Sequence, residues 1–451
     1  MTELERALVE FLPRQRWFAG KDRTVVETRV EASASLRTPL PSLSLTVVAV
    51  AFSDGGQDRY AVPVGHDRGP EARQLAANHP EAVILETKGA RAGIYYDMVA
   101  DGRLGAVVLD LIAKAETVDE LRFSKLPEWN DTLRGPGRLL GAEQSNTSLV
   151  FGDRLILKLF RRLQPGVNPE LEVTRALVGA GFKACAPPLG WVEGLGSTLA
   201  ILQPYFAGSV EGWKLATDRA TLHLRGGAAA DNFATEAREL GVLTAEMHAA
   251  LAAALPVVAA AEPDLGAHFR LLGQLSQLAV TVPELAQYKH AIESVHAQAE
   301  AAGELRYLQR IHGDYHLGQV LRTDQNWVVI DWEGEPARSL EERRRLASPL
   351  RDVAGMLRSF DYAAAYPLLD EPAEAEPPAS DGTAWVEANR TAFLDSYVGR
   401  AADGGWLPAS YELELRTYEL DKAVYEVMYE ARHRPGWIGI PLGGIRRLLG
   451  S

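Results

Sequence analysis

The chain contains very little cysteine. Cys185 is the one thiol in 451 residues, so no disulfide can form within the chain. This usage is typical of a protein in a reducing compartment. Because Cys185 stands beside Pro187 and Pro188, we interpret it as a small buried apolar residue rather than a reactive group.

Long apolar runs are also missing. No segment approaches the ~20 consecutive apolar residues that a membrane-spanning helix needs. The start, MTELERALVEFLPRQRW, carries acidic residues and lacks the long apolar stretch of a secretory signal. We therefore expect a cytoplasmic protein that does not cross a membrane.

Positive charge is in short supply. The chain has 47 Lys and Arg against 60 Asp and Glu, for a net charge of -13. Affinity for nucleic acid comes mainly from basic side chains that neutralise phosphates, so we expect no nucleic-acid partner. The length indicates roughly two or three packed units.

The pattern of apolar residues changes from strands to helices along the chain. In the first part, a helix is expected over 3–12, a hairpin over 42–52 and 59–64 around Asp54-Gly55-Gly56, a strand over 93–98 and a helix over 104–114. In the second part, apolar spacing predicts helices over 232–255, 352–362 and 411–432. Trp17 and Phe18, which are adjacent aromatics, are expected to be buried against the first sheet.

The segment 309–335, QRIHGDYHLGQVLRTDQNWVVIDWEGE, carries the most informative motif. It contains His312-x-Asp314-x4-Gln319, and Asp331 follows an apolar strand. Phosphoryl transfer needs a positioned acceptor hydroxyl and metal ions on the phosphates. Asp314 fits as the base that accepts the hydroxyl proton, and Gln319 and Asp331 fit as oxygen ligands of Mg²⁺.

Two other interpretations apply to the histidines of this motif. His312, Asp314 and His316 could be zinc ligands, but that reading leaves Gln319 and Asp331 without a role. A structural role under a turn suits His312. His316, two residues after Asp314, is a candidate catalytic group where a cation could meet the transferred phosphate.

A nucleotide site is predicted upstream of this motif. A small polar turn between two apolar strands supplies the candidate ATP-binding residues Gln144, Ser145, Asn146, Thr147 and Ser148. Lys158 interrupts the second of these strands, and a lysine there needs an acidic partner or a phosphate. Glu170 or Glu172, at the start of the following helix, could be that partner. The alternative without a functional role is that Lys158 faces solvent on an edge strand.

The apolar strand that ends at Gln203-Pro204-Tyr205 is a candidate hinge that presents backbone groups to adenine. Proline has no N–H to donate, so the hydrogen bonds would come from Gln203 or Tyr205. Both are included in the predicted ATP-binding set.

Several of these segments together resemble a known family. HGDYHLGQ, IDWEGEP, SPLRDVAGMLRSF, PRQRWFAGK and YELDKAVYEVMYEARHRPGWIGIPL are similar to segments of the bacterial maltokinases, within the aminoglycoside-phosphotransferase-like branch of the protein-kinase-like superfamily. The resemblance spans nearly the whole chain. Two small departures are Trp332, where many relatives carry Phe, and an acidic insertion near Pro377.

The resemblance implies a bilobal α+β protein-kinase-like fold with a strand-rich cap over 1–88, a nucleotide-binding lobe over 89–203 and a mainly helical lobe over 204–451. It also implies ATP and Mg²⁺ as cofactors and transfer of the γ-phosphate to the anomeric hydroxyl of maltose. Maltose 1-phosphate would then feed glycogen or α-glucan synthesis, in a pathway where trehalose synthase supplies maltose and could be a partner.

The C-terminal segment is the candidate acceptor site. On a helix over 418–432, Lys422, Glu426, Tyr429 and His433 share one face. Sugar rings commonly stack on aromatic faces while charged groups bond the hydroxyls. The candidate substrate residues are therefore Glu426, Tyr429, Arg432 and Trp437. A salt-bridged helix with core aromatics is the alternative.

Two further functions remain open at this point. The chain could be a non-catalytic scaffold for trehalose synthase, although the complete set of catalytic groups disfavours that. It could also phosphorylate another acceptor, such as glucosamine, a different sugar or an aminoglycoside, because acceptor choice depends on side-chain geometry that spacing does not fix.

Overall fold

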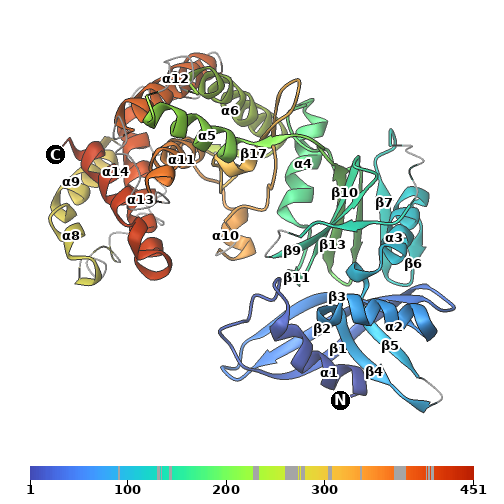
Figure 1. Ribbon diagram of the computed structural model, residues 1–451. Helices are drawn as coiled ribbons and strands as arrows, with labels where there is room; N and C mark the ends of the chain where they lie inside the picture. Colours follow the sequence, from blue (N-terminus) through green and yellow to red (C-terminus); the bar gives the residue numbers. More distant parts are fainter. Residues whose placement is uncertain are drawn as a thin grey trace. The chain divides into compact units, whose positions relative to one another are not determined.

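The computed structural model describes most of the chain. The chain divides into two compact units. The first unit comprises Met1–Glu172 and Pro187–Ala207, and the second Val173–Ala186 and Gly208–Ser451 (Figure 1). The described residues are 1–89, 92–129, 133, 135–141, 145–226, 233–259, 273, 275, 280–302, 307–335, 338–369, 382–402, 404, 407 and 411–450. Gln144 and the acidic insertion near Pro377 lie outside them.

The first unit contains an antiparallel sheet with strand order β1-β2-β3-β5-β4, and β11 pairs with β3. The strands are β1 (Val25–Arg37), β2 (Ser42–Phe52), β3 (Gln57–Asp67), β4 (Val83–Thr87), β5 (Gly93–Asp97) and β11 (Arg162–Leu163). The predicted hairpin is confirmed by β2 and β3. The expected boundary at residue 88 falls between β4 and β5, which pair with each other.

One face of this sheet is covered by the N-terminal segment. Helix α1 (Glu3–Phe11) begins with a capping box in which Thr2 and Glu5 bond each other's backbone N–H groups. Trp17 and Phe18 are 7% and 1% exposed, and both rings contact Tyr60 of β3. The expected burial of these two aromatics is confirmed.

The second sheet of this unit is a seven-stranded antiparallel sheet in the order β6-β7-β12-β13-β10-β9-β8. Its strands are β6 (Thr117–Val118), β7 (Leu121–Lys125), β8 (Arg138–Leu139), β9 (Asn146–Phe151), β10 (Leu155–Phe160), β12 (Gly190–Gly194) and β13 (Ser197–Pro204). The helices of this part of the chain are α2 (Gly69–Asn78), α3 (Gly102–Lys114) and α4 (Pro169–Gly179). Helix α3 packs on β7 and β12, and one apolar cluster joins the two sheets.

The second unit is mainly helical. Its helices are α5 (Gly212–Leu224), α6 (Ala234–Ala254), α8 (Pro283–Ala286), α9 (Lys289–Ala302), α10 (Leu340–Arg344), α11 (Leu350–Leu369), α12 (Thr383–Ala402), α13 (Tyr411–His433) and α14 (Gly439–Leu449). Helices α6, α11 and α13 confirm the three helices expected here. Together with the strand-rich first unit, they confirm the predicted α+β class.

Short strands carry the loops of interest in the second unit. They are β14 (Val210–Glu211), β15 (Val257–Ala259), β16 (Tyr307–Gln309), β17 (Val320–Arg322) and β18 (Trp327–Val329), and the 3-10 turn η6 (Leu317–Gln319) leads into β17. Cys185 is 3% exposed in the core of this unit, as expected. Burial raises the pKa of its thiol to about 12.

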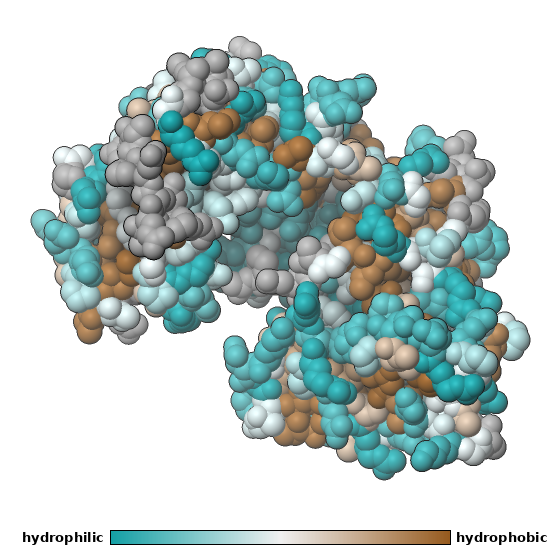
Figure 2. Space-filling view, in the orientation of Figure 1, coloured by the Kyte–Doolittle hydropathy of each residue, from teal (hydrophilic) through white to brown (hydrophobic). Residues whose placement is uncertain are grey.

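One face of the molecule is largely hydrophilic. In Figure 2, hydrophilic side chains cover much of the visible face, with smaller hydrophobic areas among them. Among the described helices, none combines the length and the apolar character that crossing a bilayer requires.

Candidate active site

The loop that carries Asp314 is held by a buried carboxylate. Asp352 of α11 is 2% exposed and accepts the backbone N–H of His312 at 2.7 Å and that of Gly313 at 2.9 Å. Burial opposes the ionisation of Asp352, but a hydrogen bond from His248 and nearby positive charge outweigh it, so its pKa lies below the ordinary value. The helical core therefore fixes the backbone next to Asp314.

His312 has a structural role in this loop. Its Nε2 lies 2.9 Å from the carbonyl oxygen of Ile330, and its Nδ1 lies 3.4 Å from the backbone nitrogen of Asp314. The carbonyl can only accept, so Nε2 carries the proton and Nδ1 accepts. Both ring nitrogens are thus engaged by the backbone. Neither is available to bind zinc, which excludes the zinc interpretation of His312.

The β17–β18 hairpin brings Gln319 and Asp331 to the same end of a strand pair. Val320 pairs with Val329, and the backbone N–H of Ile330 donates to the carbonyl of Gln319 at 3.0 Å. Asp331 follows directly, with a backbone φ of 59° that non-glycine residues seldom adopt. Such conformations are concentrated at functional sites.

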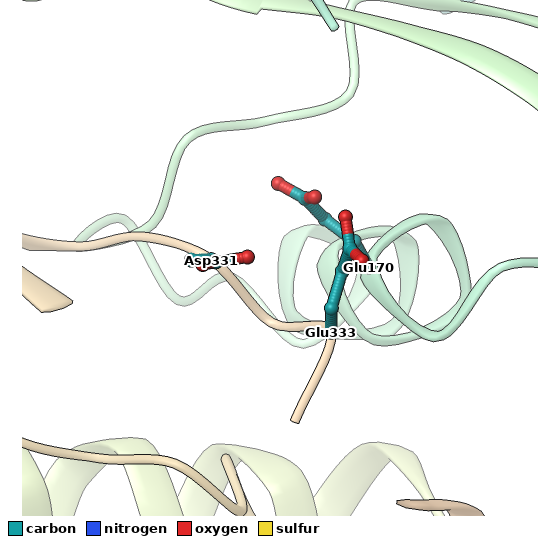
Figure 3. A group of neighbouring side chains, drawn as sticks. All are labelled: Glu170, Asp331 and Glu333. Atoms are coloured by element: carbon teal, nitrogen blue, oxygen red, sulfur yellow. The ribbon is translucent and has the colours of Figure 1, made fainter. Parts of the chain in front are cut away.

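A further acidic residue, Glu333, lies close to Asp331. Figure 3 shows both on the segment that follows β18. One carboxylate oxygen of each lies within 4.8 Å of the other, a spacing that allows shared coordination of a cation. Sequence reasoning did not select Glu333, although its position two residues after Asp331 was visible in IDWEGE.

Two nitrogen-bearing side chains flank Asp314. Lys422 of α13 places Nζ 4.0 Å from one carboxylate oxygen, and His316 places Nε2 3.9 Å from the other. The Nδ1 of His316 accepts the N–H of Gly318 at 3.0 Å, so Nε2 carries the proton. Desolvation by surrounding protein lowers the pKa of His316, although its side chain is 40% exposed. With Nδ1 engaged by Gly318, Nε2 is the nitrogen of His316 that can donate to a bound group.

Asp314 opens onto a cavity of about 240 Å³ within the second unit. The lining residues are Gly313, Asp314, Tyr315, Glu335, Arg338, Glu342, Arg351, Asp352, Gly355, Tyr418, Asp421, Lys422 and Tyr425. Four of them repeat at helical spacing on one face of α13. Sequence reasoning placed Lys422 on one face with Glu426 and Tyr429, but it selected Glu426 and Tyr429, further along the helix, for the acceptor.

The four acceptor residues predicted from the sequence do not line this cavity. Glu426 is 8% exposed, and one of its carboxylate oxygens accepts from the Nε and Nη2 of Arg358 at 3.0 and 2.7 Å. Tyr429 is 43% exposed, and Arg432 lies at the surface. Trp437 packs against two tyrosine rings of α11. For Glu426, the alternative of a salt-bridged helix describes the observed contacts.

The lysine of the first unit has an acidic partner. Lys158 lies in β10, and its Nζ is 2.8 Å from Oε2 of Glu170, at the start of α4. Their side chains are 13% and 3% exposed, respectively. Of the two glutamates considered, Glu170 is thus an observed partner of Lys158. The prediction that Glu172 belongs to the ATP-binding set stays a prediction.

The predicted nucleotide turn is described from Ser145 onward. Ser145 is exposed, whereas Asn146, Thr147 and Ser148 begin β9 and are buried. The hydroxyl of Thr147 accepts a hydrogen bond from Arg161 at 2.8 Å, so this side chain is engaged inside the protein.

The hinge candidates lie at the end of β13. Gln203 is 6% exposed and pairs with Ile156 of β10. The backbone N–H of Tyr205 donates to the carbonyl of Arg154 at 2.8 Å. That donor is used within the sheet, so Tyr205 does not offer its N–H to adenine in this arrangement.

Comparisons with known proteins agree on the kind of protein. The family model of the maltokinase N-terminal cap domain matches residues 11–101, and that of the phosphotransferase enzyme family matches residues 137–385. A glucosamine kinase of Streptacidiphilus jiangxiensis is 30% identical over 321 residues, which are 66% of this chain and 70% of the relative. A glucosamine kinase of Mycolicibacterium smegmatis is 29% identical over 393 residues, which are 85% and 97% of the two chains.

A solved structure, "Glucosamine kinase in complex with glucosamine, ADP and inorganic phosphate", resembles this chain with a TM-score of 0.72. It is 24% identical, and the match covers 98% of this chain and 99% of the other. At that identity the likeness shows the fold, which is the kinase-like fold expected from the sequence.

Proposed function

The chain belongs to the phosphotransferase enzyme family, and on this premise we propose that it is an ATP-dependent kinase that phosphorylates maltose at the anomeric hydroxyl to give maltose 1-phosphate. The observation that carries the proposal is the position of Asp314 at the cavity formed with α13. The match to the maltokinase cap domain supports maltose as the acceptor.

Asp314 would act as the base. The acceptor oxygen attacks the γ-phosphorus of ATP, the bond from that phosphorus to the bridging oxygen breaks, and ADP leaves while the hydroxyl proton passes to the Asp314 carboxylate. Asp352 contributes by fixing the loop backbone through His312 and Gly313. The N–H of His316 and the Lys422 ammonium, both close to Asp314, can donate to oxygens of the reacting groups.

Gln319 and Asp331 suit a magnesium ion. Both offer oxygen ligands, which this hard cation prefers, and Glu333 adds a carboxylate close to Asp331. Bound to these residues, the ion would neutralise charge on the ATP phosphates. Lys158, held by Glu170, would bind a phosphate oxygen in the manner of the strand lysine of protein kinases.

The charges of the cavity favour a neutral acceptor. The carboxylate of Glu335 bonds Arg338 at 2.6 Å, Asp352 is occupied by the loop, and Asp314 faces Lys422. With most acidic groups already matched by the protein, hydroxyl groups are better ligands than an ammonium group. The tyrosines of α13 add aromatic surface for a sugar ring.

Glucosamine is a second candidate acceptor. The relatives described above are glucosamine kinases. The cavity also contains Asp421, whose side chain is 21% exposed and lies 3.1 Å from His296. An amino group would gain from an accessible carboxylate.

A non-catalytic scaffold is the candidate from another class. It predicts the loss of at least one catalytic group, whereas Lys158, Glu170, Asp314, Gln319 and Asp331 are all present. An association with trehalose synthase is supported by the sequence resemblance alone.

The test is an ADP-release assay with maltose, glucose, glucosamine and kanamycin, each with magnesium and with EDTA. We expect the highest kcat/KM with maltose and no turnover in EDTA. Asp314→Asn should lose the activity, whereas Asp324→Asn, the same change at an exposed turn residue, should keep it. Preference for glucosamine would select the second candidate, and no ADP release with any acceptor would select the scaffold.

Asp421→Asn separates the two sugars further. If maltose is the acceptor, this variant should keep kcat/KM within about threefold, because a neutral hydroxyl bonds an amide as well as a carboxylate. A loss of tenfold or more confined to glucosamine would assign Asp421 to the amino group.

A further inference from the structure

A fully buried arginine lies between the two sheets of the first unit. Arg161 follows β10 directly and has no exposed surface. A charged side chain is almost never buried so completely unless it is paired. The partners of Arg161 therefore show which elements this residue connects.

The cap sheet supplies the partners of one end of the guanidinium. Nη2 lies 3.1 and 2.9 Å from the two carboxylate oxygens of Asp97, at the end of β5. The guanidinium carbon is 4.5 Å from the centre of the Trp17 ring, a cation–π geometry. The carbonyl of Arg161 also accepts the N–H of Ala61 in β3 at 2.8 Å.

The other end of the guanidinium reaches the nucleotide strand. Nε donates to the hydroxyl of Thr147 at 2.8 Å. Thr147 is the second residue of β9 and pairs with Leu159, next to Lys158 on β10. One planar side chain thus joins Asp97 of the cap sheet to the strand that leads out of the predicted phosphate-binding turn.

The buried guanidinium of Arg161 is not fully hydrogen-bonded, as it would be if the residue served stability alone. Within the described part of the chain, Nη1 of Arg161 is buried without a hydrogen-bond partner. Leaving a buried donor unpaired destabilises a protein, so a residue that does so calls for another explanation.

We propose that Arg161 is a positioning residue through which the cap sheet sets the conformation of β9 for ATP binding. The inference rests on the proposed use of ATP. Arg161 does not touch the nucleotide; it acts through Thr147. The cap is therefore part of the nucleotide site, and loosening the Asp97 end of the link weakens ATP binding without changing the acceptor site.

The test measures ATP and ADP affinity by calorimetry, together with kcat and KM for ATP and for the sugar. Asp97→Asn keeps the shape of the side chain and removes its charge. Arg161→Lys keeps the charge, but a single ammonium cannot bond both partners in the fork geometry of a guanidinium. Each variant should raise the dissociation constant for ATP about 5- to 20-fold while the KM for the sugar stays unchanged.

Arg162 provides the matched control. It follows Arg161 and bonds Asp58 of β3 at 2.7 Å, but it is 45% exposed and lies in β11, which pairs with β3. Arg162→Lys and Asp58→Asn should leave ATP affinity within about twofold. Thr147→Val, which removes only the accepting hydroxyl, is a second route if the Arg161 variant does not fold.

Three outcomes are distinguishable. If the wild-type chain binds no nucleotide, the proposed function fails. If it binds ATP and the folded Asp97→Asn and Thr147→Val variants bind equally well, the positioning role of Arg161 is refuted. If Asp97→Asn and Thr147→Val each weaken ATP binding and their effects are not additive, the coupling through Arg161 is supported, since these two side chains are bridged by the guanidinium.

Discussion

Replacing Glu426 by glutamine separates a structural from a substrate-binding role of this residue. Its carboxylate accepts two hydrogen bonds from Arg358, which is 1% exposed. The amide of glutamine keeps the shape but removes the charge. Breaking a buried ion pair by changing one partner costs about 3–5 kcal/mol. Arg358 keeps its contact with Asp361, so we expect a value near 3 kcal/mol.

The assay is thermal unfolding followed by circular dichroism. For a unit of this size, each kcal/mol lowers Tm by roughly 2–4 °C, so Glu426→Gln should lower the Tm of the second unit by about 6–12 °C. The KM for the sugar should stay close to that of the wild type at a temperature where the variant is folded. Arg432→Gln, an exposed change on the same helix, is the control and should leave Tm unchanged within about 2 °C.

The opposite pattern would refute this reasoning. A Glu426→Gln variant with an unchanged Tm and a KM for the sugar raised tenfold or more would make Glu426 an acceptor ligand. The cavity next to Asp314 would then not be the whole acceptor site.

Three other predictions concern single groups. Asp314→Asn should lower kcat by about 10²- to 10⁴-fold while calorimetry finds ATP affinity unchanged; near-normal turnover would remove Asp314 from the mechanism. Lys158→Met removes the ammonium group that pairs with the buried Glu170 carboxylate, so it should raise the KM for ATP and lower stability by about 3 kcal/mol in urea unfolding. Adding Glu170→Gln should restore the stability and not the activity; a further loss of stability would contradict the pairing. The buried Cys185 thiol, with its pKa raised to about 12, should react with a disulfide reagent only on unfolding, and rapid labelling of the native protein would argue against its burial.

Local sequence patterns predicted the elements that bury one clear face. The hairpin of β2 and β3 and helices α6 and α13 were all visible as apolar repeats. Strand β1 was not predicted. Its sequence, VVETRVEASASLR, is polar at most positions, because β1 is an edge strand with few buried residues. Its order depends on pairing with β2, which a local pattern does not contain.

The candidate site was predictable where spacing alone determines geometry. Asp314, Gln319 and Asp331 come from one short segment, and the β17–β18 hairpin brings Gln319 and Asp331 close to each other. Glu170 and Glu172 both stood at the start of α4, and two residues on a helix point about 200° apart. Choosing between them requires the position of Lys158 in space.

The acceptor face of α13 could not be chosen from the sequence for a similar reason. This helix packs against α9, α11 and α14, so polar residues point in several directions. Glu426 is polar because it meets the buried Arg358, and Lys422, four residues earlier, is polar because it faces the cavity. Helical periodicity shows which residues share a face, but the identity of the neighbour decides whether that face binds a ligand.

Because Asp331 has a left-handed backbone conformation, a substitution there that stabilises the fold would lower the activity. Glycine at this position would adopt a φ of 59° freely and would gain roughly 1 kcal/mol of folding free energy. It would also remove the carboxylate that we assign to the metal. Selection for stability alone would therefore favour glycine at this position, whereas selection for catalysis would favour the carboxylate. In a family tree, glycine at this position would mark a descendant that has given up phosphoryl transfer while keeping its fold.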